Sequence, residues 1–178
     1  MNKIMIQYFN SPTGELILGT FHDKLCLCDW KYRKMRQNID KRIQEGLNAS
    51  YGEGETIIME TVKHQLNEYF SAQRTDFDIP LLMVGSAFQK SVWNELLMIP
   101  YGKTESYLGL SRKIGHEKAI RSVAAANGAN AIAIIIPCHR IIGSDGKLTG
   151  YAGGLQAKRK LLQLEMHKHS SQQLTLFN

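Results

Sequence analysis

The 178-residue sequence has few cysteines, few prolines and no long hydrophobic run. Its longest apolar stretch, residues 129–137, is interrupted by Asn130. It is far shorter than the roughly 18 residues that indicate a membrane-spanning helix. The N-terminal residues also lack the apolar segment of a secretory signal peptide. We therefore expect a protein of the cytoplasm, in a reducing compartment and without membrane association.

The three cysteines do not form a disulfide framework. Their number is odd, and Cys26 and Cys28 are separated by a single residue, with Cys138 far along the chain. On a strand, Cys26 and Cys28 would point to the same face. They are candidates either for metal ligation or for the buried face of a strand. We favour the buried face because no zinc-type ligand spacing accompanies them. The sequence thus predicts no bound metal.

Acidic residues are scarce in the second half of the chain. Residues 1–85 hold 10 Lys and Arg against 11 Asp and Glu, whereas residues 86–178 hold 12 against 5. The first half is therefore close to neutral, and the second half carries the whole positive net charge. This asymmetry indicates a polyanionic partner for the second half, although a solvated basic surface would give the same pattern.

The first half has the pattern of a small sheet with one good helix. Residues 4–9, 16–20 and 24–30 are strand-like and are separated by turn residues, which predicts an antiparallel meander. Residues 31–50 are polar and basic, and indicate a loop with a weak helix. Helical spacing returns over residues 60–70, and residues 74–82 are a candidate for a strand that closes the sheet. A domain boundary is expected between residues 85 and 86.

The second half has the pattern of a helix-turn-helix unit. Ser86 and Gln89 have capping-box spacing at the start of a helix that is expected to end at Met98. Two short helices follow, the first capped by Thr104 and the second over residues 117–126, with a glycine-containing turn between them. The second helix is rich in small residues, which favours close approach to another surface or tight internal packing. Composition leaves both open.

The segment Pro137-Cys138-His139-Arg140 ends a buried, strand-like run and precedes a glycine-rich stretch. A cysteine acts as a nucleophile only as its thiolate, and neighbouring cations lower its pKa. Adjacent side chains on an extended strand point to opposite faces, so His139 would need a bend or a bridging water to reach Cys138. A buried, inert thiol remains the alternative on this local pattern.

The residues around Cys138 resemble the signature of the O6-alkylguanine-DNA alkyltransferases. Further blocks match this family in family order, and together they cover about residues 86–165. These blocks are Phe88-Gln89 with Val92-Trp93, Ile99-Pro100-Tyr101-Gly102, Ser106-Tyr107, Lys118 to Val123, Asn127 to Asn130, Ile136 to Ile142 and Gly150 to Leu155.

The resemblance implies a two-domain α/β (α+β) fold. Residues 1–85 would form an N-terminal domain with an antiparallel sheet and ribonuclease-H-like topology. Residues 86–178 would form a C-terminal winged-helix domain that carries the helix-turn-helix. The N-terminal half is much less similar to the family than the C-terminal half.

The resemblance also implies DNA repair in which the protein itself accepts the alkyl group. An alkyl group on O6 of guanine in double-stranded DNA would pass to Cys138 in a single-turnover reaction, with O4-alkylthymine as a second candidate substrate. No cofactor is implied, and the protein would act as a monomer where DNA is present. Two alternatives remain: a non-catalytic helix-turn-helix protein that senses damaged or regulatory DNA, and a less favoured cysteine hydrolase.

Within this family pattern, four residues are implied in the chemistry. Cys138 would accept the alkyl group, and His139 would take the thiol proton through a water. Glu165 would orient the imidazole, and Asn130 would tie the helix-turn-helix to the strand that carries Cys138.

Substrate and DNA contacts are implied as well, because an alkylated base inside a duplex must be flipped out before it can react. Arg121 would fill the vacated stack, and Tyr107 would help to rotate the nucleotide and then bond the base. Tyr151 would wall the pocket, the Ala152 N–H would bond O6, and carbonyls near Cys138 and Ile141 would accept from the exocyclic amine. Asn127 replaces a larger apolar residue of some relatives, which leaves the binding of bulky alkyl groups open. The implied DNA surface also includes Ala119, Ser122, Ala125, Ala126 and Arg140.

Overall fold

Three consecutive strands form the antiparallel meander that the sequence predicts. The computed structural model describes residues 2–175, with side chains over residues 2–167. The strands are β1 (Asn2–Ser11), β2 (Gly14–Phe21) and β3 (Lys24–Trp30). Phe9 pairs with Leu16, and Leu18 pairs with Cys28. Tight turns join the three strands, so the pairing of the residues next to each turn follows directly from the local sequence.

A fourth strand is added to the predicted antiparallel meander and makes the sheet mixed. Helix α1 (Arg36–Leu47) carries the chain back across the sheet, and β4 (Ala49–Glu53) then pairs parallel to β1. The sheet order is β3-β2-β1-β4. Residues 74–82 do not close the sheet as a strand. They add only an isolated bridge between Leu25 and Leu81 at the β3 edge.

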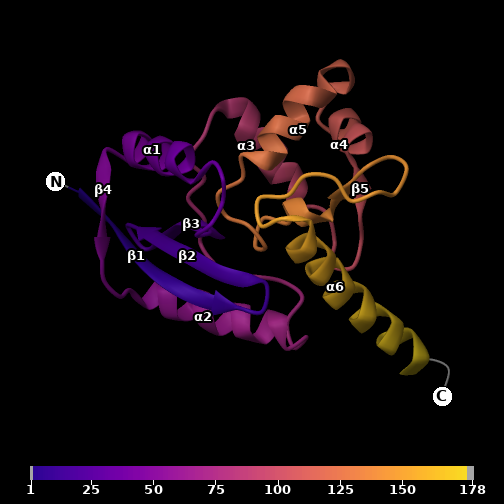
Figure 1. Cartoon of the computed structure of the whole chain (residues 1–178), viewed down its shortest axis with the longest axis horizontal. Helices are drawn as coiled ribbons and strands as arrows, with labels where there is room; N and C mark the ends of the chain where they lie inside the picture. The colour runs from indigo at the N-terminus through magenta and orange to yellow at the C-terminus, as the bar shows by residue number, and fades with distance from the viewer. Residues whose placement is uncertain (1, 176–178) are drawn as a thin grey trace.

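Both faces of the sheet are covered, by α1 on one side and α2 (Ile57–Phe70) on the other (Figure 1). Leu18 and Cys28 pack in the cluster that contains Leu66 of α2, whereas Cys26 lies in the cluster that contains Ile43 of α1. The prediction that the two cysteines share a face is wrong, because the β2–β3 register shifts at Gly19 and Thr20. A bulge of this kind turns one side chain to the other face.

Helix α3 (Ala87–Leu96) opens the second half with the predicted capping box. Ser86 accepts from the Gln89 N–H, and the Gln89 side chain accepts from the Ser86 N–H. The helix ends before Met98, and the short strand β5 (Glu105–Ser106) follows. Ser106, and not Thr104, caps the next helix, α4 (Tyr107–Lys113), by accepting from the Gly109 N–H. The predicted cap lies too far upstream because Thr104 comes before β5.

The helix-turn-helix arrangement is completed by α5 (Ile120–Gly128), which follows a 3₁₀ turn at Glu117–Ala119. Gly115, with φ of 73°, makes the turn between the two helices. The last part of the described chain contains a 3₁₀ helix at Cys138–Arg140, the short strand β6 (Ile141–Ile142) and helix α6 (Leu155–Thr175). Strand β6 pairs parallel to β5. No helix in the described part of the chain is both long and apolar enough to cross a membrane.

Candidate functional site

The residues before Cys138 are buried but do not form the predicted strand. Ile132 makes an isolated bridge to Cys28 of β3, and the run then turns at Ile134, whose φ is +71°. A β-branched residue in this region is strained, so the surrounding packing must hold it there. A pattern of alternating apolar and polar residues cannot reveal the path of this segment, because every residue of it is buried. It carries Cys138 from the edge of the sheet to the start of the 3₁₀ helix.

Cys138 lies at the base of the site, with 4% of its surface exposed. Asn130 reaches it, with Nδ2 3.2 Å from Sγ and 2.9 Å from the Ile136 carbonyl oxygen. The Asn130 Oδ1 accepts from the Ile132 N–H at 2.9 Å. Asn130 therefore fixes both the buried run and the sulfur that follows it.

Burial raises the pKa of the Cys138 thiol, and this outweighs the lowering effect of the Asn130 hydrogen bond and of the Arg33 charge. The prediction that cationic neighbours lower this pKa is therefore wrong for the net effect. Arg140 directs its charge toward Glu165 instead, and burial favours a neutral His139. The resting group is a neutral thiol, so a base must take its proton before it can act as a nucleophile.

His139, Arg140 and Glu165 form one buried cluster. The His139 Nε2 lies 2.7 Å from the Glu165 Oε1, while the Arg140 Nε and Nη2 bond the two carboxylate oxygens at 2.9 and 3.1 Å. Arg140 also donates to the Ile99 carbonyl at 2.5 Å. The structure thus corrects the expectation that Arg140 contacts DNA. Its side chain is buried, and its donors are directed into the protein.

The cluster fixes the protonation of the imidazole. Burial raises the pKa of Glu165, but the hydrogen bonds and charges of His139 and Arg140 outweigh it and lower the value to about 2. Burial lowers the pKa of His139, against the raising effect of Glu165. A neutral His139 that donates from Nε2 to this carboxylate keeps its lone pair on Nδ1. The arrangement therefore supplies an imidazole with a free acceptor nitrogen on the residue that follows the nucleophile in the chain.

Cys138 opens into a cavity of about 840 Å³ between the two halves of the chain. Four predicted substrate contacts line it: Tyr107, Asn127, Tyr151 and Ala152. Ile141 does not line this cavity, and its side chain is fully buried in β6. The volume is within the range of small-ligand pockets, and a nucleobase is a ligand of that size.

Several buried polar atoms at the site have no hydrogen-bond partner within the described residues. They are the Asn127 Oδ1, the His139 Nδ1 and the Tyr151 hydroxyl. Buried polar atoms are nearly always paired, so unpaired ones are expected where a ligand or water completes the bonding. Their gathering near Cys138 is typical of a site that awaits a polar ligand.

The outer surface of α5 has the small and cationic side chains that the sequence suggested. Arg121, Ser122 and Ala125 are exposed, and Ala119 is half-buried. Ala126 is the exception, since it is buried in the core and its carbonyl accepts from the Trp93 Nε1 at 2.8 Å. The prediction that Ala126 lies on a DNA-facing surface is therefore wrong, because at this helix position the small side chain serves internal packing.

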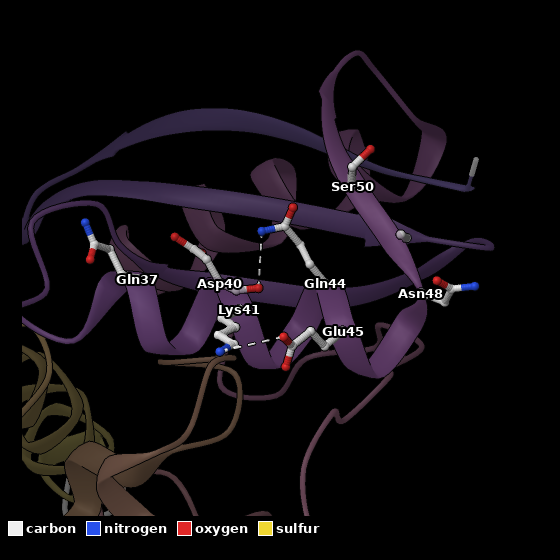
Figure 2. A pocket seen from close by; sticks show the side chains of 8 residues that line it. Gln37, Asp40, Lys41, Gln44, Glu45, Asn48 and Ser50 are labelled. Carbon is white, nitrogen blue, oxygen red and sulfur yellow. Dashed lines mark hydrogen bonds and ion pairs between the residues drawn. The ribbon is translucent and has the colours of Figure 1, made fainter.

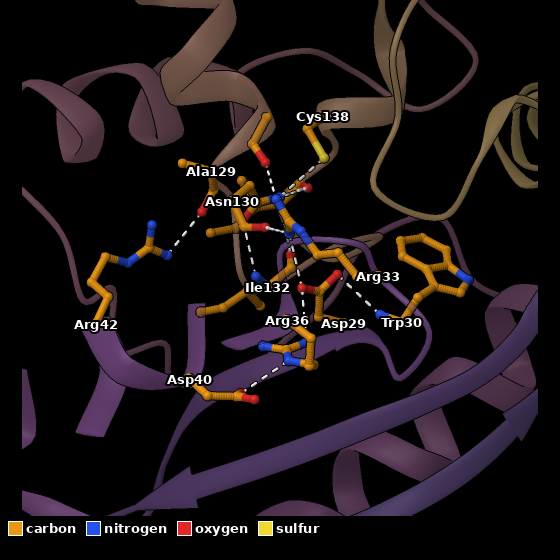
Figure 3. A network of polar contacts seen from close by, with 12 residues as sticks. Asp29, Trp30, Arg33, Arg36, Asp40, Arg42, Ala129, Asn130, Ile132 and Cys138 are labelled. Carbon is orange, nitrogen blue, oxygen red and sulfur yellow. Dashed lines mark hydrogen bonds and ion pairs between the residues drawn. The ribbon is translucent and has the colours of Figure 1, made fainter. Parts of the chain in front are cut away.

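The N-terminal half contributes residues to the site that sequence reasoning missed. Arg33 bonds Asp29 at 2.8 Å, the Asn130 carbonyl at 2.8 Å and the Gly128 carbonyl, and Figure 3 shows it between β3 and the segment that leads to Cys138. Trp30 lies edge-on to Tyr151 and so close to Gly153 that a Cβ there would be 2.5 Å from the indole. A basic stretch read as a loop gives no sign of such contacts, because they join residues about 100 positions apart.

Lys158 is a second unforeseen residue, since it is fully buried on α6. Its Nζ donates to the Thr149 carbonyl at 2.8 Å and lies 3.5 Å from the Gly150 carbonyl. Both carbonyls belong to the glycine-rich stretch that walls the cavity. Burial lowers the pKa of Lys158 to about 8. In the sequence this lysine looks like an ordinary residue of a basic helix.

Another hollow, of about 560 Å³, lies over α1 and the start of β4 (Figure 2). Several of its polar side chains are engaged with neighbouring residues of α1. Lys41 pairs with Glu45 at 3.8 Å, and the Gln44 Nε2 donates to the Asp40 carbonyl at 3.4 Å. The lining does not include Cys138 or its partners. We therefore place the functional site at the Cys138 cavity.

Comparison with known proteins agrees with this placement. Residues 87–167 match a family model described as "6-O-methylguanine DNA methyltransferase, DNA binding domain". Residues 4–83 match the model of the ribonuclease-like domain of the same methyltransferase. The two matched segments leave out only the ends of the chain and residues 84–86.

Individual relatives carry corresponding names. A methylated-DNA--protein-cysteine methyltransferase of Mycobacterium leprae is 49% identical over 172 residues, which cover 95% of this chain and 96% of the relative. The relative from Methanosarcina acetivorans is 42% identical over 88% of this chain and 95% of its own length.

Solved structures are similar over the same extent. The crystal structure of Mycobacterium tuberculosis OGT in complex with DNA superimposes with a TM-score of 0.80 and 39% sequence identity, and covers 93% of this chain and 94% of the other. Since both halves match in sequence and in structure, the chain belongs to the 6-O-methylguanine DNA methyltransferase family.

Proposed function

We propose that this protein repairs DNA by moving an alkyl group from O6 of guanine to the sulfur of its own Cys138. The observation that carries the proposal is the arrangement at the base of the cavity. A buried thiol is held by Asn130, next to a His139–Glu165 pair whose imidazole has a free Nδ1 among the described residues. Family membership supplies the substrate class.

The reaction balances without a cofactor. His139 takes the proton from the Cys138 thiol, with a water as the bridge, and the thiolate attacks the alkyl carbon. The S–C bond forms as the C–O6 bond breaks, and the electron pair of that bond goes to guanine. The proton ends on the guanine ring, so the products are unmodified guanine and a thioether. Because water does not cleave a thioether, each molecule reacts once.

The remaining lining residues would hold the base. The Ala152 N–H would bond O6 and assist departure of the guanine, while Tyr151 walls the cavity and the Tyr107 hydroxyl bonds the base. The carbonyls near Cys138 and Ile141 would accept from the exocyclic amine. The unpaired Asn127 Oδ1 lies beside this space and offers a further acceptor.

DNA is the partner of the second half of the chain. The base must leave the duplex to reach the cavity, and unstacking costs a few kcal/mol. Arg121, exposed on α5, would fill the vacated stack, while Ala119, Ser122 and Ala125 allow the helix to approach the groove closely. We further propose that the protein acts as a monomer in a reducing, DNA-containing compartment such as the cytoplasm, with residues 1–85 and 86–178 as its two domains.

Intact-mass spectrometry tests the proposal directly. The protein is mixed with a duplex that contains one O6-methylguanine, and Cys138→Ala serves as the matched variant. We expect a single methyl group on the wild type, mapped to Cys138 and saturating at one per protein, and none on the variant. A duplex with O4-methylthymine measures the second substrate. An unchanged mass with retained DNA binding would reject alkyl transfer in favour of damage sensing.

A further inference from the structure

Glu165 receives a hydrogen bond from the N-terminal half of the chain. The Tyr69 hydroxyl, at the end of α2, lies 2.7 Å from the Glu165 Oε1. The same oxygen bonds the His139 Nε2 at 2.7 Å and the Arg140 Nη2 at 3.1 Å. The other oxygen bonds the Arg140 Nε and accepts from the Gly102 N–H at 3.2 Å. Tyr69 thus shares with His139 the oxygen on which the orientation of the imidazole depends.

The position of Tyr69 is fixed by its ring. The side chain is fully buried and packs against three aromatic neighbours, with centroid distances of 5.4 Å to Phe70, 5.4 Å to Phe77 and 6.0 Å to Tyr101. A ring held in this way keeps its hydroxyl in one place. Burial and the nearby Glu165 charge raise the pKa of Tyr69 well above its ordinary value, so the hydroxyl stays a donor.

We propose that Tyr69 is a positioning residue for the proton transfer: by bonding the Glu165 oxygen that His139 also bonds, it limits how strongly that carboxylate attracts the imidazole. The inference rests on the proposed function, in which His139 must be neutral before it takes the thiol proton. A carboxylate oxygen that accepts a further hydrogen bond is a weaker partner for an imidazolium ion. Tyr69 therefore helps to keep His139 available as a base. The N-terminal half then takes part in the chemistry.

Other charged or titratable groups that face Glu165 and His139 do not duplicate the role of Tyr69. Arg140 neutralises the carboxylate charge from the 3₁₀ helix, and its bidentate contact remains when the tyrosine hydroxyl is removed. Further groups among the described residues that influence Glu165 or His139, or lie next to them, include Tyr101, Cys138, Tyr151 and Lys158.

The test compares Tyr69→Phe with Tyr51→Phe over a range of pH. Tyr69→Phe keeps the ring and removes only the hydroxyl. Tyr51→Phe removes a similar hydroxyl, which bonds the Asp40 carboxylate at 2.7 Å in the same half of the chain but away from His139. The single-turnover rate of methyl transfer is measured at saturating duplex with O6-methylguanine from pH 4.5 to 8.5.

Removal of the Tyr69 hydroxyl should raise the pKa of His139. We expect the rising limb of the rate profile to move by about one pH unit to higher pH, which makes transfer about tenfold slower below the midpoint. At high pH the Tyr69→Phe rate should approach that of the wild type, and Tyr51→Phe should follow the wild type throughout. A Tyr69→Phe rate that is reduced by one constant factor at every pH, or not reduced at all, would overturn the inference.

An NMR titration of the His139 imidazole, assigned with a His139→Gln variant, separates this inference from the proposed function. A higher pKa of His139 in Tyr69→Phe supports the positioning role, and an unchanged pKa rejects it, whether or not the wild type transfers a methyl group. Absence of methyl transfer by the wild type would reject only the proposed function.

Discussion

Glu165 is the residue on which the buried site depends most. It receives five hydrogen bonds, from Tyr69, Gly102, His139 and twice from Arg140. A buried charge is tolerated only when it is paired and its hydrogen-bonding capacity is used. The stability that this carboxylate contributes is present above about pH 4.5 and is lost as the pH falls toward 2, because folding lowers its pKa.

Replacement of Glu165 by Gln removes this charge and leaves Arg140 buried without an anion. We expect methyl transfer to slow by about 100-fold, because His139 loses the group that orients it and stabilises its protonated form. The free energy of unfolding should fall by about 3 kcal/mol, as for other broken buried pairs. Transfer is measured by single-turnover assay and stability by urea denaturation. Glu60→Gln breaks an exposed pair with Lys63 and should change neither quantity; equal effects would contradict the argument.

Lys158 gives a prediction of pH-dependent stability. Burial lowers its pKa from 10.5 to about 8, so between these values the unfolded chain binds more protons than the folded one. The contribution of Lys158 to stability therefore rises as the pH increases from 8 to 10.5, by at most about 1.4 kcal/mol per pH unit. We expect the difference in unfolding free energy between wild type and Lys158→Met to move in favour of the wild type across this window. Urea titrations at several pH values would show it, and a constant difference would disprove it.

At the scale of elements, helix α5 has one face buried in the core and one face exposed. Val123 and Ala126 are buried in the core, whereas Arg121, Ser122 and Ala125 are exposed. A short helix with small residues on both sides can pack closely inside while it leaves room outside for a second surface. The structure thus shows the internal packing at Val123 and Ala126, and close approach to DNA by the outer face stays a prediction.

Replacement of Arg121 by Ala should separate base flipping from chemistry. We expect transfer from duplex O6-methylguanine to slow by tenfold or more, because the flipped state loses the side chain that fills the stack, a cost of a few kcal/mol. The reaction with the free base O6-methylguanine should be unchanged, since no duplex has to open. Arg74→Ala, remote from α5, is the matched control. Equal losses on duplex and free base would contradict the assigned role.

For the whole molecule, the two halves share one core and one polar network. Trp30 of β3 and Trp93 of α3 belong to the same hydrophobic cluster. Arg33 joins Asp29 of β3 to the backbone of Gly128 and Asn130, and Arg42 donates to the Ala129 carbonyl at 2.8 Å (Figure 3). The segment that positions Cys138 is therefore held from the N-terminal half.

Replacement of Arg33 by Met should weaken the whole protein. Asp29 keeps Arg36 as a partner at 3.0 Å, but the buried Asn130 carbonyl and the partly buried Gly128 carbonyl lose their donor. We expect a loss of about 3 kcal/mol in unfolding free energy, with a single transition seen alike by circular dichroism and tryptophan fluorescence. Lys34→Met, at an exposed neighbouring position, should leave stability within about 0.5 kcal/mol of wild type. Two separate transitions in the wild type would contradict the shared core.

The sequence by itself determined the features that depend on neighbouring residues. The meander of the first 30 residues, the Ser86–Gln89 capping box and the turn at Gly115 follow from alternation, capping and glycine chemistry over a few positions. Cys138 and the surrounding blocks also indicated the family, because a spaced set of motifs is specific even when each block is short.

Only the tertiary structure decided the features that depend on contacts between distant segments. The parallel pairing of β4, the bulge that separates Cys26 from Cys28 and the buried run before Cys138 all arise from packing against other segments. Arg140 illustrates the reason: the family resemblance implied a DNA contact, but its side chain bonds Glu165, 25 positions along the chain, inside the protein. The bond from Tyr69 to Glu165 spans 96 positions, and no local pattern in the sequence records it.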